Sequence, residues 1–141
     1  MRLQLALNVS DLESSISFYQ AMFDTPPAKI KPGYANFAIT NPPLKLVLFE
    51  NSTEGGTINH LGVETETTGE VVAAEARLSD GGLKTTGVDE TVCCYAEKTE
   101  TWVTDPDTLR WEYYMKEADA DVMSEPAPTP ATGYNDEVCC A

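Results

Sequence analysis

The alternation of apolar and polar positions predicts a strand, a helix and three more strands in the first half of the chain. Segment 3–9, LQLALNV, alternates with a period of two, as a strand with one buried face does. The next segment, SDLESSISFYQAMF, spaces its large apolar side chains as a helix does, and Ser10 or Asp11 can cap it. Three short strand candidates follow, separated by KPG and NPP turns, at 28–30, 34–40 and 44–50.

The second half of the chain repeats this order. Segment 59–65, NHLGVET, alternates like the first strand, and 70–78, EVVAAEARL, has the composition of a helix. Strand candidates follow at 83–96, 98–104 and 109–115. Superposing LQLALNV on NHLGVET places Gln4 on His60, so the chain contains an internal duplication of about 55 residues. We therefore predict two tandem βαβββ modules, 1–52 and 57–116.

Composition sets the class of protein. A chain of 141 residues with 42% hydrophobic content suits one domain, which we place at 1–116. In residues 117–141, Pro, Ala and acidic residues replace the large apolar ones, which predicts a flexible acidic tail. The net charge of −14 disfavours nucleic acids and anionic membranes as partners. The N-terminal residues resemble neither a signal peptide nor a membrane span, which predicts a cytoplasmic protein with reduced thiols.

The two modules resemble the vicinal oxygen chelate superfamily, which includes glyoxalase I, bleomycin-resistance proteins and extradiol dioxygenases. The resemblance rests on a polar ligand on the first strand of each module and on the tract DPDTLRWE in the second. It implies an α+β fold with a half-barrel sheet around a metal site. The tracts PGYANFAITNPPLKLVLFEN, INHLGVE and VCCYA are similar to its cadmium-induced and arsenic-detoxifying branch, in particular the carbon-arsenic lyases. Those relatives are Fe(II)-dependent dioxygenases that act on trivalent organoarsenicals.

A metal site is predicted at Gln4, His60 and Glu112. His60 is the only histidine of the chain, and alone it would be read as a structural residue more often than as a ligand. Glu112 lies in the apolar tract RWEYYM, where a carboxylate faces solvent or needs a cation. One imidazole and two oxygen ligands suit Fe(II) or another divalent first-row metal, with open positions for O2 and catalysis. Glu50 is a possible fourth ligand, but the repeat places Val47 at the position that matches Glu112.

Cys93 and Cys94 are adjacent inside TVCCYAEKTETW, and Cys139 and Cys140 form a second pair in the tail. Successive side chains of a strand point to opposite faces, so two thiols reach one arsenic only if the backbone leaves the extended conformation. We therefore predict a mobile loop or bulge near 90–96 that binds the substrate, with Tyr95 as a wall of the site. The alternative is that Cys93 and Cys94 are small strand hydrophobes. Cys139 and Cys140 are possible accessory thiols.

These residues, together with the reaction class that the resemblance implies, leave three possible functions. The first is an Fe(II)-dependent, O2-consuming carbon-arsenic lyase in which Cys93 and Cys94 capture the substrate and Gln4, His60 and Glu112 hold the metal. The second is a protein that sequesters arsenicals or cadmium through its thiols without turnover. A weaker third is a glyoxalase-like isomerase, which the missing fourth ligand and the paired thiols disfavour. The repeat permits a monomer or a homodimer.

Overall fold

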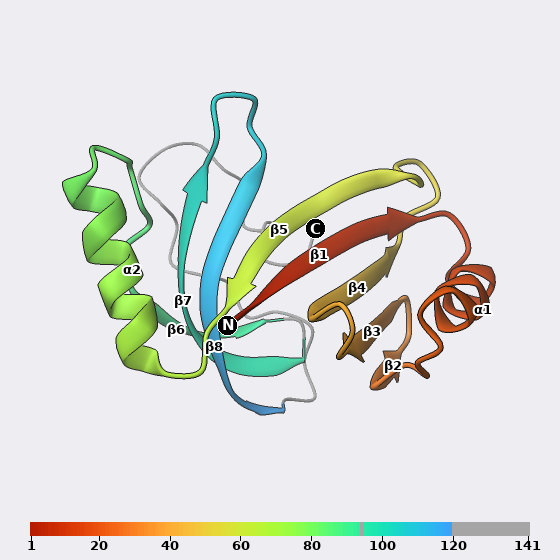
Figure 1. Cartoon of the computed structure of the whole chain (residues 1–141). Coiled ribbons are helices and arrows are strands. Elements are labelled where there is room, and N and C mark those ends of the chain that lie inside the picture. Colours follow the sequence, from red (N-terminus) through yellow and green to blue (C-terminus); the bar gives the residue numbers. More distant parts are fainter. Residues whose placement is uncertain (94, 120–141) are drawn as a thin grey trace. The chain divides into compact units, whose positions relative to one another are not determined.

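The computed structural model describes residues 1–93 and 95–119, with only the backbone at position 93 (Figure 1). The chain divides into two compact units, Arg2–Leu61 and Met1 with the chain from Gly62 onward. The boundary falls inside strand β5 (Thr57–Glu64), so this strand contributes its first part to one unit and its last part to the other.

The first unit is a βαβββ module followed by the start of β5. Its elements are β1 (Arg2–Val9), α1 (Leu12–Phe23), β2 (Lys29–Lys31), β3 (Tyr34–Ile39) and β4 (Leu44–Glu50). The strand order is β2-β3-β4-β1, with β5 beyond β1. Strands β1 and β4 are parallel, and the other two pairs, β2–β3 and β3–β4, are antiparallel. Helix α1 packs on β3 and β4 over an apolar core, as expected for an amphipathic helix.

Two carboxylates accept hydrogen bonds from the first turn of α1. Asp11 is the N-cap, and its carboxylate accepts a hydrogen bond from the Ser14 N–H at 2.9 Å. The Glu50 carboxylate, at the end of β4, accepts from the Leu12 N–H at 2.8 Å. Glu50 therefore acts as a second acceptor for the first turn of the helix.

The second unit has the same order of elements. After the last part of β5 come α2 (Thr68–Asp80), β6 (Asp89–Cys93), β7 (Ala96–Thr104) and β8 (Arg110–Asp119). The strand order is β5-β8-β7-β6, and α2 packs against β7 and β8 (Figure 1). Thr67 and Glu70 form a capping box at the start of α2. The register of β7 and β8 shifts at Glu97/Lys98, which marks a β-bulge.

The predicted α+β class with two tandem βαβββ modules is confirmed, and two local predictions are wrong. Residues 83–88 form no strand, and the third strand from the end starts only at Asp89. The predicted loop near 90–96 is strand through Cys93, which pairs with Ala96. Only two residues connect β6 to β7, and the described one, Tyr95, has a φ of 60°.

At the C-terminal side, β8 continues to Asp119, three residues beyond the predicted boundary at Lys116. The predicted tail from 120 onward, with Cys139 and Cys140, lies outside the described residues, as does Cys94. Among the helices of the described part, none is both long and apolar enough to span a membrane.

Candidate functional site

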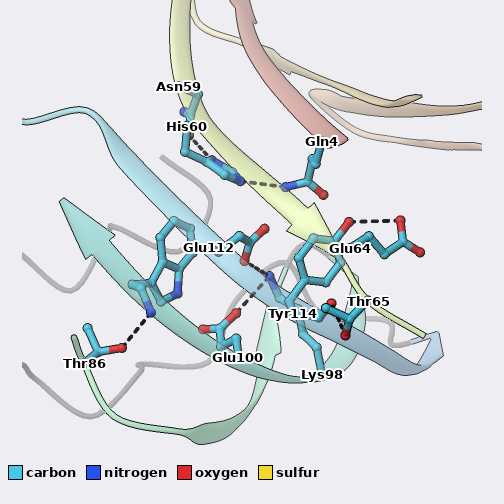
Figure 2. Close-up of polar contacts among 11 residues, drawn as sticks. Gln4, Asn59, His60, Glu64, Thr65, Thr86, Lys98, Glu100, Glu112 and Tyr114 are labelled. Carbon is cyan, nitrogen blue, oxygen red and sulfur yellow. Dashed lines mark hydrogen bonds and ion pairs between the residues drawn. The ribbon is translucent and has the colours of Figure 1, made fainter. Parts of the chain in front are cut away.

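The first unit brings together two of the three predicted metal ligands. The Gln4 side chain from β1 and the His60 side chain from β5 meet with their Nε2 atoms 3.0 Å apart (Figure 2). Both side chains are buried, with exposed fractions of 5% and 1%. The Phe49 ring lies 6.2 Å from the imidazole, centroid to centroid, and forms an apolar neighbour. The two positions that the internal repeat superposes are adjacent in space, because β1 and β5 are neighbouring strands.

The Gln4–His60 pair has the spacing of two metal ligands. Two ligands at right angles, each with a bond of about 2.1 Å, lie about 3.0 Å apart. Imidazole nitrogen and amide oxygen are both donors for divalent first-row metals, and Gln4 would have to present Oε1 instead of Nε2. The two side chains therefore fit a metal ion of this class.

A chain of amide side chains lies behind the other ring nitrogen of His60. His60 Nδ1 is 2.7 Å from Asn59 Oδ1, and Asn59 Nδ2 donates to Asn8 Oδ1 at 3.0 Å. Asn8 in turn donates to Thr57 Oγ1 at 2.9 Å. Sequence reasoning missed Asn8 and Asn59 as site residues, because strict alternation assigns Asn59 and His60 to opposite faces of a strand.

In the second unit, Glu112 is buried in an ion-pair cluster on one face of β7 and β8. Lys98 Nζ donates to Glu112 Oε2 at 2.7 Å and lies 3.0 Å from Glu100 Oε2 (Figure 2). The side chains of Lys98, Glu100 and Glu112 are each no more than 3% exposed. The ammonium also lies 5.0 Å from the Tyr114 ring centroid. The cation that a buried Glu112 requires is thus present as Lys98, a residue the sequence reasoning did not name.

Burial and charge act in opposite directions on this cluster. Burial by itself lowers the pKa of Lys98, but the carboxylates of Glu112 and Glu100 outweigh it and hold that pKa above its usual range. Burial raises the pKa of Glu100, Lys98 opposes the rise, and the like charge of Glu112 adds to it. Lys98 therefore stays protonated at neutral pH and shares its charge between two carboxylates.

The remaining candidate residues are Cys93 and Glu50. Cys93 ends β6, directly before the turn that contains Tyr95, so the strand is interrupted beside the first thiol of the pair. The Glu50 carboxylate caps α1, which gives it a structural role in place of a ligand role. Among the described residues, no group of three or more His, Cys, Asp or Glu side chains is arranged to hold a metal ion. The predicted set differs from such a group, because one ligand is an amide and Glu112 belongs to the other unit.

The fold and the sequence define the class of protein. Residues 3–113 match the family model of the glyoxalase/bleomycin resistance protein/dioxygenase superfamily, and the chain belongs to this superfamily. The chain is 50% identical over 140 residues to the cadmium-induced protein CadI of Mycobacterium tuberculosis, covering 99% of this chain and 92% of the relative. It is 48% identical over 140 residues to a trivalent organoarsenical cleaving enzyme of Thermomonospora curvata, covering 99% and 87%.

A solved structure supports the fold. The Mn(II)-bound glyoxalase of Novosphingobium aromaticivorans superposes with a TM-score of 0.57 at 17% sequence identity. The match covers 84% of this chain and 40% of that protein. At this identity the likeness shows the shared fold, in a protein that carries a divalent metal.

Proposed function

We propose that this protein is an Fe(II)-dependent dioxygenase that cleaves the carbon-arsenic bond of trivalent organoarsenicals and releases arsenite. The observation that carries the proposal is the convergence of Gln4 and His60 at 3.0 Å in a buried position. The name of the relative from Thermomonospora curvata, at 48% identity, supports the substrate class. Methylarsenite is the simplest member of that class.

The paired thiols Cys93 and Cys94 would bind the substrate. A trivalent organoarsenical R–As(OH)2 reacts with two thiols to form two arsenic-sulfur bonds and release two waters, which leaves its arsenic-carbon bond intact. Thiolates are the preferred ligands of soft, thiophilic atoms. The chain turns between Cys93 and Ala96, and Tyr95 in this turn has a φ of 60°. This departure from the extended conformation supports a backbone that can bring two adjacent thiols to one atom. Tyr95, with its left-handed backbone, is proposed as a wall of this site.

Gln4, His60 and Glu112 would hold the iron, which supplies O2 activation when bound. His60 offers a buried imidazole nitrogen, and Gln4 offers an amide oxygen after rotation of its side chain. Glu112 would supply the anionic ligand and would have to share its carboxylate with Lys98. Other divalent first-row metals suit the same donors.

One O2 balances the proposed reaction. Methylarsenite, CH3As(OH)2, plus O2 gives arsenite, As(OH)3, plus formaldehyde. The carbon is oxidised, O2 is reduced, and arsenic remains trivalent. The proposal therefore requires arsenite and the carbon product in equal amounts. A cytoplasmic location and a monomeric or homodimeric state remain predictions.

The variant His60→Ala separates substrate binding from cleavage. Methylarsenite should still bind H60A with wild-type stoichiometry through the thiols, while arsenite formation by the Fe(II)-loaded protein should fall at least 100-fold. Asn36→Ala is the matched control, since Asn36 is a buried polar residue of the same unit that bonds Tyr34 at 2.9 Å and does not take part in the proposed site. Arsenite formation by H60A at the wild-type rate would refute the metal assignment.

The second candidate is sequestration without turnover. It is favoured by the 50% identity to a protein named for its induction by cadmium and by the ion pair that already neutralises Glu112. A sequestering protein should bind methylarsenite or Cd(II) through Cys93 and Cys94 with or without iron. It should release no arsenite under any loading, and H60A should then behave as the wild type.

A further inference from the structure

Four hydrogen bonds connect His60 to the backbone of the loop before β5. His60 Nδ1 contacts Asn59 Oδ1, Asn59 contacts Asn8, and Asn8 contacts Thr57. This chain of hydrogen bonds ends at the Thr57 hydroxyl, whose Oγ1 lies 2.6 Å from the carbonyl oxygen of Glu54. All of these residues belong to the first unit. Nothing in the proposed reaction requires Asn59, Asn8 or Thr57, so the role of this chain of hydrogen bonds needs its own explanation.

The carbonyl of Glu54 fixes the direction of every bond in the chain. A carbonyl oxygen only accepts, so the Thr57 hydroxyl must donate to it and must therefore accept from Asn8. Asn8 then presents its Nδ2 to Thr57 and its Oδ1 to the Nδ2 of Asn59. Asn59 is left with its oxygen toward His60.

The His60 ring must consequently carry its proton on Nδ1. Asn59 Oδ1 can only accept, so Nδ1–H donates to it at 2.7 Å. The opposite nitrogen, Nε2, faces the amide nitrogen of Gln4 at 3.0 Å, which can only donate. Both ends of the ring thus agree on a neutral imidazole with its lone pair on Nε2.

We propose that Asn59 is a positioning residue that holds His60 in the Nδ1–H tautomer, so that Nε2 is the nitrogen presented to the metal. The inference rests on the proposed role of His60 as a ligand. Metal-bound histidines commonly donate their second ring N–H to a fixed acceptor, which orients the ring. Here the acceptor is a neutral amide anchored through Asn8 and Thr57 to a backbone carbonyl. The ring is oriented without placing another negative charge beside the ligand.

Because His60 is the only histidine, ¹⁵N NMR of the metal-free protein reads its tautomer without overlap. With a neutral ring, the wild type should show a protonated Nδ1 and an unprotonated Nε2. Asn59→Ala should lose this preference and shift toward Nε2–H or a mixture. Asn59→Asp keeps an acceptor oxygen and should retain the Nδ1–H form. The control Asn36→Ala loses a buried amide elsewhere in the unit and should leave the spectrum unchanged.

The affinity for Fe(II) or Co(II) gives the second readout. Asn59→Ala should weaken binding by roughly 10- to 100-fold, as loss of an outer hydrogen-bond partner does, and N59D should restore most of it. An Nδ1–H tautomer that persists in N59A overturns the proposal, as does unchanged metal affinity in N59A when His60→Ala abolishes binding. If H60A leaves metal affinity intact, the proposed metal site fails instead, and the tautomer spectra still decide whether Asn59 sets the ring.

Discussion

Lys98 is the residue on which the charge balance of the second unit depends. It lies 2.7 Å from one buried carboxylate and 3.0 Å from another, so a single ammonium compensates two negative charges. Removing one member of a buried ion pair leaves an uncompensated charge in a medium of low polarity, which is strongly destabilising. The cluster therefore ties the stability of this unit to the state of a proposed metal ligand, Glu112.

Lys98→Met should lower the free energy of unfolding by about 3–5 kcal/mol, because Glu100 and Glu112 then repel each other while buried. Urea denaturation followed by circular dichroism measures the change. The double variant Lys98→Met/Glu100→Gln should recover part of the loss, since one negative charge is removed. Lys84→Met, at an exposed position, is the matched control and should stay within about 0.5 kcal/mol. A loss below 1 kcal/mol for Lys98→Met would contradict this assignment.

At the scale of single residues, the sequence predicts that two side chains are in contact only where a repeat or a regular spacing relates their positions. The duplication brought Gln4 and His60 together, and the structure confirms their contact. Lys98 was not named because the partners of a lysine depend on which face of its strand is inward. That face follows from the pairing of β7 with β8 and from the bulge at Glu97/Lys98, neither of which local composition encodes.

At the scale of elements, the β2–β3 connection depends on one glycine. Lys31 pairs with Tyr34, which leaves Pro32 and Gly33 to reverse the chain. Gly33 has a φ of 69°, and its carbonyl accepts from the Glu50 N–H at 2.9 Å, which joins the turn to the end of β4. A residue with a Cβ is strained in this conformation.

Gly33→Ala should therefore destabilise the protein by about 1–2 kcal/mol, although no heavy atom lies within 4 Å of the added Cβ. The loss would come from backbone strain and not from a clash. Gly69→Ala, in the first turn of α2, is the matched control and should be neutral or stabilising by up to about 1 kcal/mol. Equal midpoints of thermal unfolding for the two variants would argue against the strained turn.

The capping box of α2 predicts a pH dependence. The pKa of Glu70 lies below its usual value, because the backbone N–H groups of Glu66 and Thr67 donate to its carboxylate at 2.8 and 3.1 Å. A carboxyl whose pKa is lower in the folded state stabilises fully above its unfolded pKa, and that contribution disappears as the pH falls through the folded pKa. Stability should therefore drop in this acidic window.

Glu70→Gln removes the titrating group and keeps an acceptor, so it should flatten the acid limb of the stability curve. Urea midpoints measured between pH 7 and pH 3 test this, with Asp80→Asn at the other end of the same helix as the control. D80N should not flatten the limb, because it leaves the hydrogen bonds of the Glu66 and Thr67 N–H groups to Glu70 in place. An acid limb in E70Q as steep as that of the wild type would be inconsistent with the capping role.

The helices and strands were predictable where the alternation of apolar and polar residues agreed with the positions of the turn residues. Strands β2, β3 and β4 lie within a residue or two of their predicted bounds, because KPG and NPP turns separate them. Residues 83–88 were wrongly predicted as strand. LKTTG has strand-forming residues, and the Thr86 N–H donates to the Trp102 carbonyl of β7 at 3.1 Å, but the segment does not form a strand. The loop predicted near 90–96 was wrong because residues 89–93 pair with β7 and the chain turns only between Cys93 and Ala96, and only strand pairing shows where a hairpin closes.

At the scale of the whole molecule, the tandem modules, the polar residue on the first strand of each and the tract DPDTLRWE resembled the superfamily to which the chain belongs. The duplication predicted two βαβββ modules, and the match of residues 3–113 to the superfamily model confirms them as this fold. The chemistry depends on fewer residues than the fold does. In the proposed function, two cysteine pairs, one histidine and two side chains with metal-binding oxygens would decide between cleaving and holding an arsenical.

The two cysteine pairs should contribute unequally to activity. Cys93→Ser/Cys94→Ser should abolish methylarsenite binding and reduce arsenite formation at least 100-fold, because both bonds to the arsenic are lost. Cys139→Ser/Cys140→Ser should retain at least half of the wild-type rate. Inductively coupled plasma mass spectrometry of bound arsenic, with chromatographic separation of arsenite, measures both effects. The reverse order of sensitivity would assign substrate capture to the second pair.

The most direct test of the proposed function is arsenite release by the reconstituted protein. The purified chain is loaded anaerobically with Fe(II), given methylarsenite, and exposed to O2, with a metal-free sample and His60→Ala in parallel. We expect arsenite to form over many turnovers in the iron-loaded wild type alone, with one O2 consumed per arsenite. Arsenite no higher than in the metal-free sample, with methylarsenite still bound, would contradict the enzymatic account and favour sequestration.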